Sequence, residues 1–164
     1  MQKKKEEEII KDIQDIKKAV VKKEPKHFGF RDVIHSFFGS LILAITFALK
    51  GLLVEVAILL TKTQQILIVL STLVILTLEI YFFGYSKVIS KEERRFPQFL
   101  LKRLITFYLV AIFVSFFIVG IYGLQNLPLV GSSFENMVKL VIVISMPAAI
   151  GAGSADLVKR YRSD

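Results

Sequence analysis

Five ionisable side chains within the long apolar stretches of this sequence are the candidates for chemistry there: His35, Lys50, Glu55, Glu79 and Asp156. An ionisable group inside a membrane helix costs about 2.5 to 3.5 kcal/mol on insertion scales, so such groups mark ion sites, proton relays or internal pairs. Glu79 is the deepest of the acids, about 10 Å from the inner end of its stretch at about 1.5 Å per residue. The sequence therefore predicts either an ion or proton site at Glu79 or a structural hydrogen bond.

Depth also selects the groups that could share an ion or proton with Glu79. Asp156 lies within one helical turn of the inner boundary, and His35 lies about 3 Å from it. Lys50 would be about 15 Å from Glu79 along the membrane normal. We therefore expect His35 and Asp156 to be the partners of Glu79 in an ion or proton site.

Lys50, Glu55 and Thr46 are secondary polar candidates. Lys50 and Glu55 are five residues apart, which places them on different faces of one helix. Both are expected to extend toward the outer surface or to meet the charges there, which are Lys139 and Glu135. Thr46 and Lys50 also belong to a polar stripe that could face the fourth apolar stretch, together with His35 and Gly39.

The residue types that most enzymes and metal sites need are scarce. The chain has two histidines and no cysteine, so it has neither a paired-histidine zinc motif nor a soft metal cage. It lacks the lysine of a phosphate-binding loop and the setting of a serine nucleophile. We expect no catalytic residues, metal or cofactor, and we place an enzyme acting on lipids last among the possible functions.

Composition and patterning indicate that the segments that carry these residues lie in the lipid bilayer. Of 164 residues 54% are hydrophobic, and the mean hydropathy is +0.58. A membrane helix needs about 20 apolar residues, and none of the stretches shows the alternation of a barrel strand. The sequence predicts an all-α four-helix transmembrane bundle over residues 33–158, with spans at residues 33–60, 66–85, 104–124 and 137–158.

Orientation follows from the lysines and arginines, because basic residues near a span resist translocation. Nineteen of the 22 precede the first span, flank the turn between the second and third, or follow the fourth. Four spans with both termini cytoplasmic satisfy all of these segments in a multi-pass protein of the cell membrane. The net charge of +8 is then a consequence of topology, so we expect no nucleic-acid partner.

The amino-terminal segment, residues 1–26, has the apolar spacing of a cytoplasmic coiled coil. The apolar positions are four, three and four apart: Ile9, Ile13, Ile16 and Val20. Isoleucine at both a and d positions favours trimers or larger assemblies, so we expect a homo-oligomer. The alternative is an amphipathic helix on the inner leaflet, but the segment has no aromatic residue on its apolar stripe and contains six acids. Residues 27–32 form a linker, and residues 159–164 form a cytoplasmic tail.

The fourth span is rich in small residues after a proline. Small residues at four-residue spacing let helix backbones approach closely, and a proline frees a carbonyl and permits a kink. Tight packing is the favoured meaning, and a pore-lining or gating helix is the alternative. The residues concerned are Pro147, Ala148, Gly151, Ala152 and Gly153.

The segment from Pro147 to Ala152, together with the entry Gly29-Phe30-Arg31 and a first span that ends near Glu55, resembles a family of small prokaryotic integral membrane proteins of unknown function. The resemblance covers about residues 29–158, and the coiled-coil segment lies outside it. It implies the four-helix membrane fold and no particular activity.

Three functions remain as hypotheses. The favoured one is an oligomeric pore or small ion transporter in which the acid at Glu79 selects cations. The second is a non-catalytic scaffold whose basic amino-terminal segment recruits a partner or anionic lipid. The third is the lipid enzyme already placed last.

Overall fold

The computed structural model describes residues 29–85, 96–131 and 133–162, together with Ile10 and Ile13. All the elements in these residues are helical: α2 (Phe30–Ala48), α3 (Gly51–Leu59), α4 (Lys62–Glu79), the π-helix η1 (Ile80–Tyr85), α5 (Phe96–Ile121), the 3₁₀ helix η3 (Leu124–Asn126) and α6 (Phe134–Arg162). Four segments are long and apolar enough to cross a membrane: Phe30–Ala48, Lys62–Phe82, Leu100–Ile121 and Phe134–Asp156. The predicted all-α fold with four candidate spans is confirmed.

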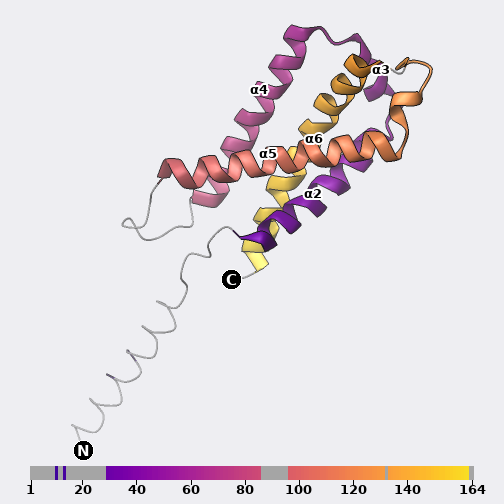
Figure 1. The fold of residues 1–164 in the computed structure, drawn as a ribbon. Helices are drawn as coiled ribbons and strands as arrows, with labels where there is room; N and C mark the ends of the chain where they lie inside the picture. Colours follow the sequence, from indigo (N-terminus) through magenta and orange to yellow (C-terminus); the bar gives the residue numbers. More distant parts are fainter. Residues whose placement is uncertain (1–9, 11–12, 14–28, 86–95, 132, 163–164) are drawn as a thin grey trace, which may run out of the picture.

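The four long helices run alternately in opposite directions (Figure 1). The start of α2, the end of α4, the start of α5 and the end of α6 lie at one end of the bundle, which we name the inner end after its predicted orientation. The other end, the outer end, carries α3 and the connection from α5 to α6. This arrangement gathers polar residues from four different helices at one level of the bundle.

The first apolar stretch is not one helix. It breaks after Ala48, because Lys50 has an extended backbone with φ −85° and ψ 107° and begins α3 as its N-cap. The ammonium of Lys50 lies 5.2 Å from the centre of the Phe47 ring, a cation–π contact at the end of the span. Only α2 is therefore long enough to span, and the nine residues of α3 pack at the outer end through Val54 and Ala57.

The second stretch begins as an α-helix and ends as a π-helix. Thr61 and Gln64 form a capping box at the start of α4, with the Thr61 N–H donating to Gln64 Oε1 at 2.9 Å. At the other end, the α-helix gives way after Glu79 to the π-helix η1. Short π segments occur frequently at functional sites, and this one directly follows the deepest predicted acid.

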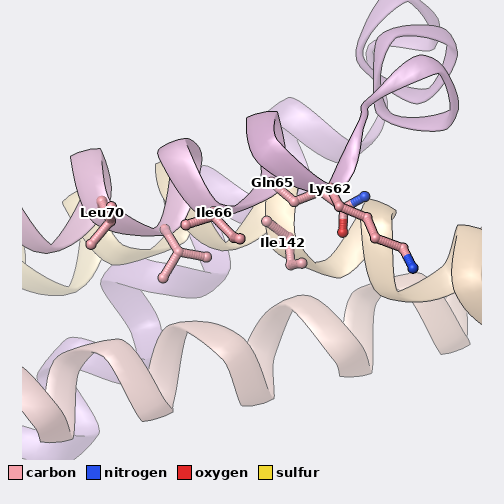
Figure 2. A pocket seen from close by; sticks show the side chains of 6 residues that line it. Lys62, Gln65, Ile66, Leu70 and Ile142 are labelled. Carbon is pink, nitrogen blue, oxygen red and sulfur yellow. The ribbon is translucent and has the colours of Figure 1, made fainter.

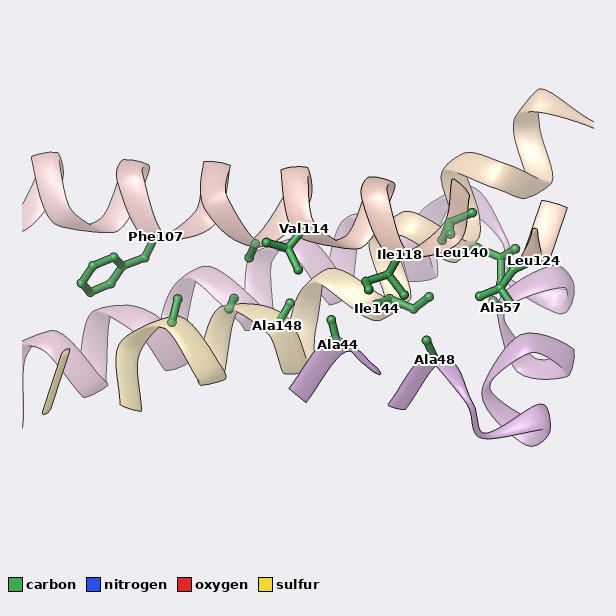
Figure 3. Packing of buried hydrophobic residues seen from close by; sticks show 14 of the residues in the cluster. Ala44, Ala48, Ala57, Phe107, Val114, Ile118, Leu124, Leu140, Ile144 and Ala148 are labelled. Carbon is green, nitrogen blue, oxygen red and sulfur yellow. The ribbon is translucent and has the colours of Figure 1, made fainter. Parts of the chain in front are cut away.

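The core lies between α2, α5 and α6, and α6 is its central helix. The apolar part of α6 is 56% buried, against 17% to 33% for the other three spans. Small and medium side chains meet there, among them Ala44 on α2, Val114 on α5 and Ala148 on α6 (Figure 3). The second span, α4, is the least buried of the four.

The buried face of α2 differs from the predicted polar stripe. The residues that face the core are four apart and small: Asp32, Ser36, Ser40, Ala44 and Ala48. The side chains of His35, Thr46 and Lys50 are exposed instead, so these three members of the stripe do not face α6. Gly39 does reach α6, because close approach of two helices requires small residues rather than polar ones.

Most of the proposed coiled coil lies outside the described residues, including Ile9, Ile16 and Val20. Ile13 is described; its backbone is helical and 58% of the residue is exposed. The coiled coil therefore stays a prediction.

Candidate functional site

Glu79 ends α4 and inserts its carboxylate between α4 and α6. Its Oε1 accepts a hydrogen bond from the Ser154 hydroxyl at 3.0 Å. Its Oε2 is buried and has no hydrogen-bond partner among the described residues. The carboxylate rests against Gly153, where a Cβ atom would collide with Oε2 and would lie 2.6 Å from the Glu79 Cδ. Glycine at position 153 is thus what makes room for the acid.

Asp156 lies near Glu79 but has a cation of its own. Arg103 Nη1 on α5 lies 3.2 Å from Asp156 Oδ2 on α6, and the two side chains are only 5% and 7% exposed. Asp32, at the start of α2, is also buried and close enough to attract the same guanidinium. The ion pair therefore joins α5 to α6 at the inner end, with an acid of α2 beside it.

The charges of Glu79 and Asp156 are balanced in different ways. Asp156 is close enough to Glu79 to repel its charge, but the negative charge of Asp156 is balanced by Arg103. Among the described residues, the Glu79 carboxylate accepts one hydrogen bond, from the neutral hydroxyl of Ser154. A carboxylate in an apolar environment with one unsatisfied oxygen favours a proton or a cation as its missing partner. Glu79 is therefore the group in this cluster best suited to exchange one.

The structure brings two of the three predicted site residues together. Glu79 and Asp156 share the inner cluster, whereas the side chain of His35 is exposed on α2. The expected proximity of His35 and Glu79 rested on depth alone. Depth does not determine which face of a helix a residue occupies, and His35 lies outside the buried stripe of α2.

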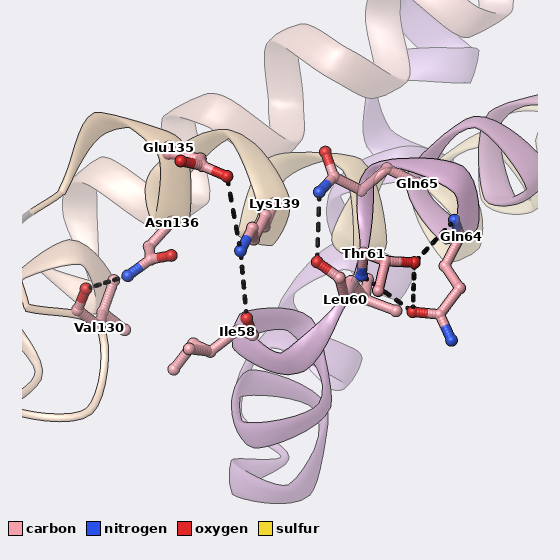
Figure 4. A network of polar contacts seen from close by, with 9 residues as sticks. All are labelled: Ile58, Leu60, Thr61, Gln64, Gln65, Val130, Glu135, Asn136 and Lys139. Atoms are coloured by element: carbon pink, nitrogen blue, oxygen red, sulfur yellow. Dashed lines mark hydrogen bonds and ion pairs between the residues drawn. The ribbon is translucent and has the colours of Figure 1, made fainter.

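The secondary polar candidates lie away from this cluster. Thr46 is exposed and its hydroxyl donates to the Ile42 carbonyl at 2.8 Å within its own helix. Glu55 is exposed on α3. At the outer end, Lys139 Nζ lies 3.7 Å from Glu135 Oε1 and donates to the Ile58 carbonyl at 3.2 Å, which ties α6 to α3 (Figure 4).

The small residues of α6 contact two neighbouring helices. Ala148 and Ala152 are fully buried, and Gly151 packs directly against the backbone of Gly39 on α2. Gly153 faces Glu79, as described above. Pro147 lies within α6, which continues through it from Phe134 to Arg162.

Sequence reasoning missed Arg103, Asp32 and Ser154. It counted Arg103 only as a cytoplasmic flanking charge, although this residue lies three positions inside the candidate span Leu100–Ile121. A usable signal was its spacing, because Arg103 is four residues before Phe107 and eight before Ala111, which puts all three on one helical face. That face is buried in the structure.

Among the described residues, no group of three or more histidine, cysteine or acidic side chains could hold a metal ion. Comparison with curated proteins and with solved structures gives no match. A family described as "Putative integral membrane protein (DUF2391)" matches residues 1–158. The match begins at residue 1, so the expectation that the amino-terminal segment lies outside the family is wrong. With nearly the whole sequence covered, the chain belongs to the DUF2391 family of integral membrane proteins.

Proposed function

We propose that this protein moves small monovalent cations, protons included, across the membrane, with Glu79 as the group that binds and releases the ion. The observation that carries the proposal is the Glu79 carboxylate: one hydroxyl donates to it, and its second oxygen is buried and has no hydrogen-bond partner in the part of the chain that the structure describes. Leaving such a group unsatisfied is costly in an apolar environment, and a bound cation or proton removes that cost.

The surroundings of Glu79 support exchange rather than permanent storage of the ion. Asp156 forms an ion pair with Arg103, so this neighbouring acid does not compete with Glu79 for the incoming cation. α4 is the least buried span, and the π-helix begins directly after Glu79. A helix with few buried residues and a change of hydrogen-bonding pattern beside its acid can shift at a lower cost than the tightly packed α2 and α6.

The Glu79→Gln variant tests this role. Glutamine keeps the size of the side chain and can accept the bond from Ser154, but it has no charge to offer an ion. We expect cation flux into proteoliposomes to fall by about tenfold or more, the factor that corresponds to about 1.4 kcal/mol of lost interaction with the ion. Flux is followed with K⁺-, Na⁺- and pH-sensitive dyes inside the vesicles.

Glu55→Gln is the matched control, because it removes the same charge from an exposed position at the outer end. Its flux should equal that of the unaltered chain. Equal flux in Glu79→Gln would remove Glu79 from the pathway. Flux no faster than in protein-free vesicles would overturn the transport function itself.

We further infer that the chain is a homo-oligomer, with both termini cytoplasmic and residues 1–26 as its coiled coil. The isoleucine and valine spacing of this segment and the inner position of most basic residues support this arrangement. Assembly would also give ions a route between copies, since the centre of the described bundle is filled by fully buried side chains such as Leu76, Leu140 and Ile144.

An Ile13→Cys variant tests assembly and orientation together, because the chain has no other cysteine. Ile13 is a core position of the proposed heptads, so we expect oxidation to cross-link two copies. A membrane-impermeant maleimide should label this thiol in inverted vesicles and not in right-side-out vesicles. Lys11→Cys, at an outward heptad position, should label equally and cross-link much less. Equal cross-linking would contradict the coiled coil, and labelling in right-side-out vesicles would contradict the orientation.

A further inference from the structure

A groove runs along the surface between α4 and α6 at the end of the bundle opposite to Glu79. It has a volume of about 290 Å³ and is lined by Lys62, Gln65, Ile66, Val69, Leu70 and Ile142. The two polar residues lie at one end, and the apolar residues continue along α4 from there (Figure 2). We propose that this groove binds an anionic phospholipid, with an acyl chain along the apolar wall and the phosphate beside Lys62.

The apolar side chains of the groove are the part that an acyl chain would contact. Ile66 and Leu70 are 61% and 53% exposed, and they lie inside the candidate span Lys62–Phe82. At that depth the solvent is hydrocarbon, and an open groove there has to be filled by something that packs against it. An extended acyl chain matches a groove that follows the helix axis between two spans.

The charge of Lys62 is the reason to expect an anionic headgroup. Lys62 is the first residue of its candidate span, which places its ammonium at the level of the lipid phosphates. No described residue forms a salt bridge with it, whereas Lys139 at the same end is held by Glu135 and by the Ile58 carbonyl. The other polar residue of the groove, Gln65, donates its side-chain amide to the Leu60 carbonyl at 3.4 Å, so Lys62 is the polar group of the groove that is left for a ligand. Lys62 also begins α4, and the positive end of the helix dipole adds to its attraction for an anion.

The test uses the absence of tryptophan from the chain, which makes one introduced tryptophan the only indole. Ile66→Trp places the reporter at the groove, and Phe117→Trp places it on the exposed surface of α5. Each position is four residues from the outer end of its span, so the two reporters have the same depth. Both variants are placed in phosphatidylcholine vesicles that contain a rising fraction of phosphatidylglycerol, with bromine on the acyl chains of one lipid or the other.

We expect phosphatidylglycerol to associate with the Ile66→Trp reporter about fivefold more strongly than phosphatidylcholine does, the effect of one lysine near an anionic headgroup. The Phe117→Trp reporter should show a ratio of about one. Adding Lys62→Gln to Ile66→Trp should bring the ratio to about one, while adding Lys50→Gln, which removes an exposed lysine at the same end, should leave it unchanged.

A third reporter, Leu67→Trp, is next to Ile66 in the sequence but does not line the groove, so its indole is a control for one that itself fills the site. The Ile66→Trp and Leu67→Trp reporters should both lose their preference when Lys62→Gln is added. Equal ratios at all three reporters would overturn the proposal. Weaker quenching than at position 117 by both lipids would overturn it too, since it would mean that protein from a second copy covers the groove.

Discussion

Replacing Arg103 by methionine is expected to destabilise the bundle by about 3 to 5 kcal/mol, the usual cost of removing one partner from a buried ion pair. The guanidinium and the Asp156 carboxylate are almost fully buried and 3.2 Å apart. Without Arg103, the buried Asp156 carboxylate would lose this cation while it still repels the nearby Glu79, and Asp32 would lose the attraction of the same guanidinium. The loss would therefore be larger than the worth of the pair itself.

Thermal or denaturant unfolding of the protein in detergent micelles measures this loss. Lys102→Met is the matched control, since Lys102 is exposed on the same turn of α5 and its removal should change stability by less than about 0.5 kcal/mol. The double variant Arg103→Met with Asp156→Leu should recover most of the lost stability, because replacing both partners by apolar residues is often neutral. If Arg103→Met alone were as stable as the unaltered chain, the ion pair would not contribute to the stability of the bundle.

The number and placement of the spans could be predicted from the sequence because they depend on the strongest term, the transfer of apolar residues into hydrocarbon. The division of the first stretch could not. Lys50 and Gly51 break the helix there, but a lysine near a membrane boundary is equally compatible with a continuous helix whose side chain extends to water. The choice depends on the packing of α3 at the outer end, which composition does not reveal.

The candidate site was predictable in part for a similar reason. Glu79 is conspicuous because it is the sole charge in its apolar stretch, and the small residues of α6 are conspicuous because of their spacing. Which residues they contact depends on the rotation of each helix about its axis. That rotation places Ser154 on Glu79 and Arg103 on Asp156, and it leaves His35 exposed.

The close contact between Gly151 on α6 and Gly39 on α2 leads to the second large prediction. A Cβ atom at Gly151 would collide with the Gly39 carbonyl oxygen and would lie 2.8 Å from its carbonyl carbon. Backbone atoms cannot rotate away as a side chain can, so α2 and α6 must separate. We expect Gly151→Ala to destabilise the bundle by about 1 to 3 kcal/mol, as for other overpacked cores. Unfolding in detergent micelles measures the change.

Two other glycines separate this steric effect from the general effect of alanine in a helix. Gly120 on α5 has open space around it, so Gly120→Ala should be neutral or stabilise by up to about 1 kcal/mol. At Gly153 the collision is with the Glu79 carboxylate, which is the end of a flexible side chain and can move. Gly153→Ala should therefore reduce cation flux while costing less stability than Gly151→Ala. If Gly151→Ala were as stable as Gly120→Ala, the two helices would not be held by backbone contact, and the small residues of α6 would need another explanation.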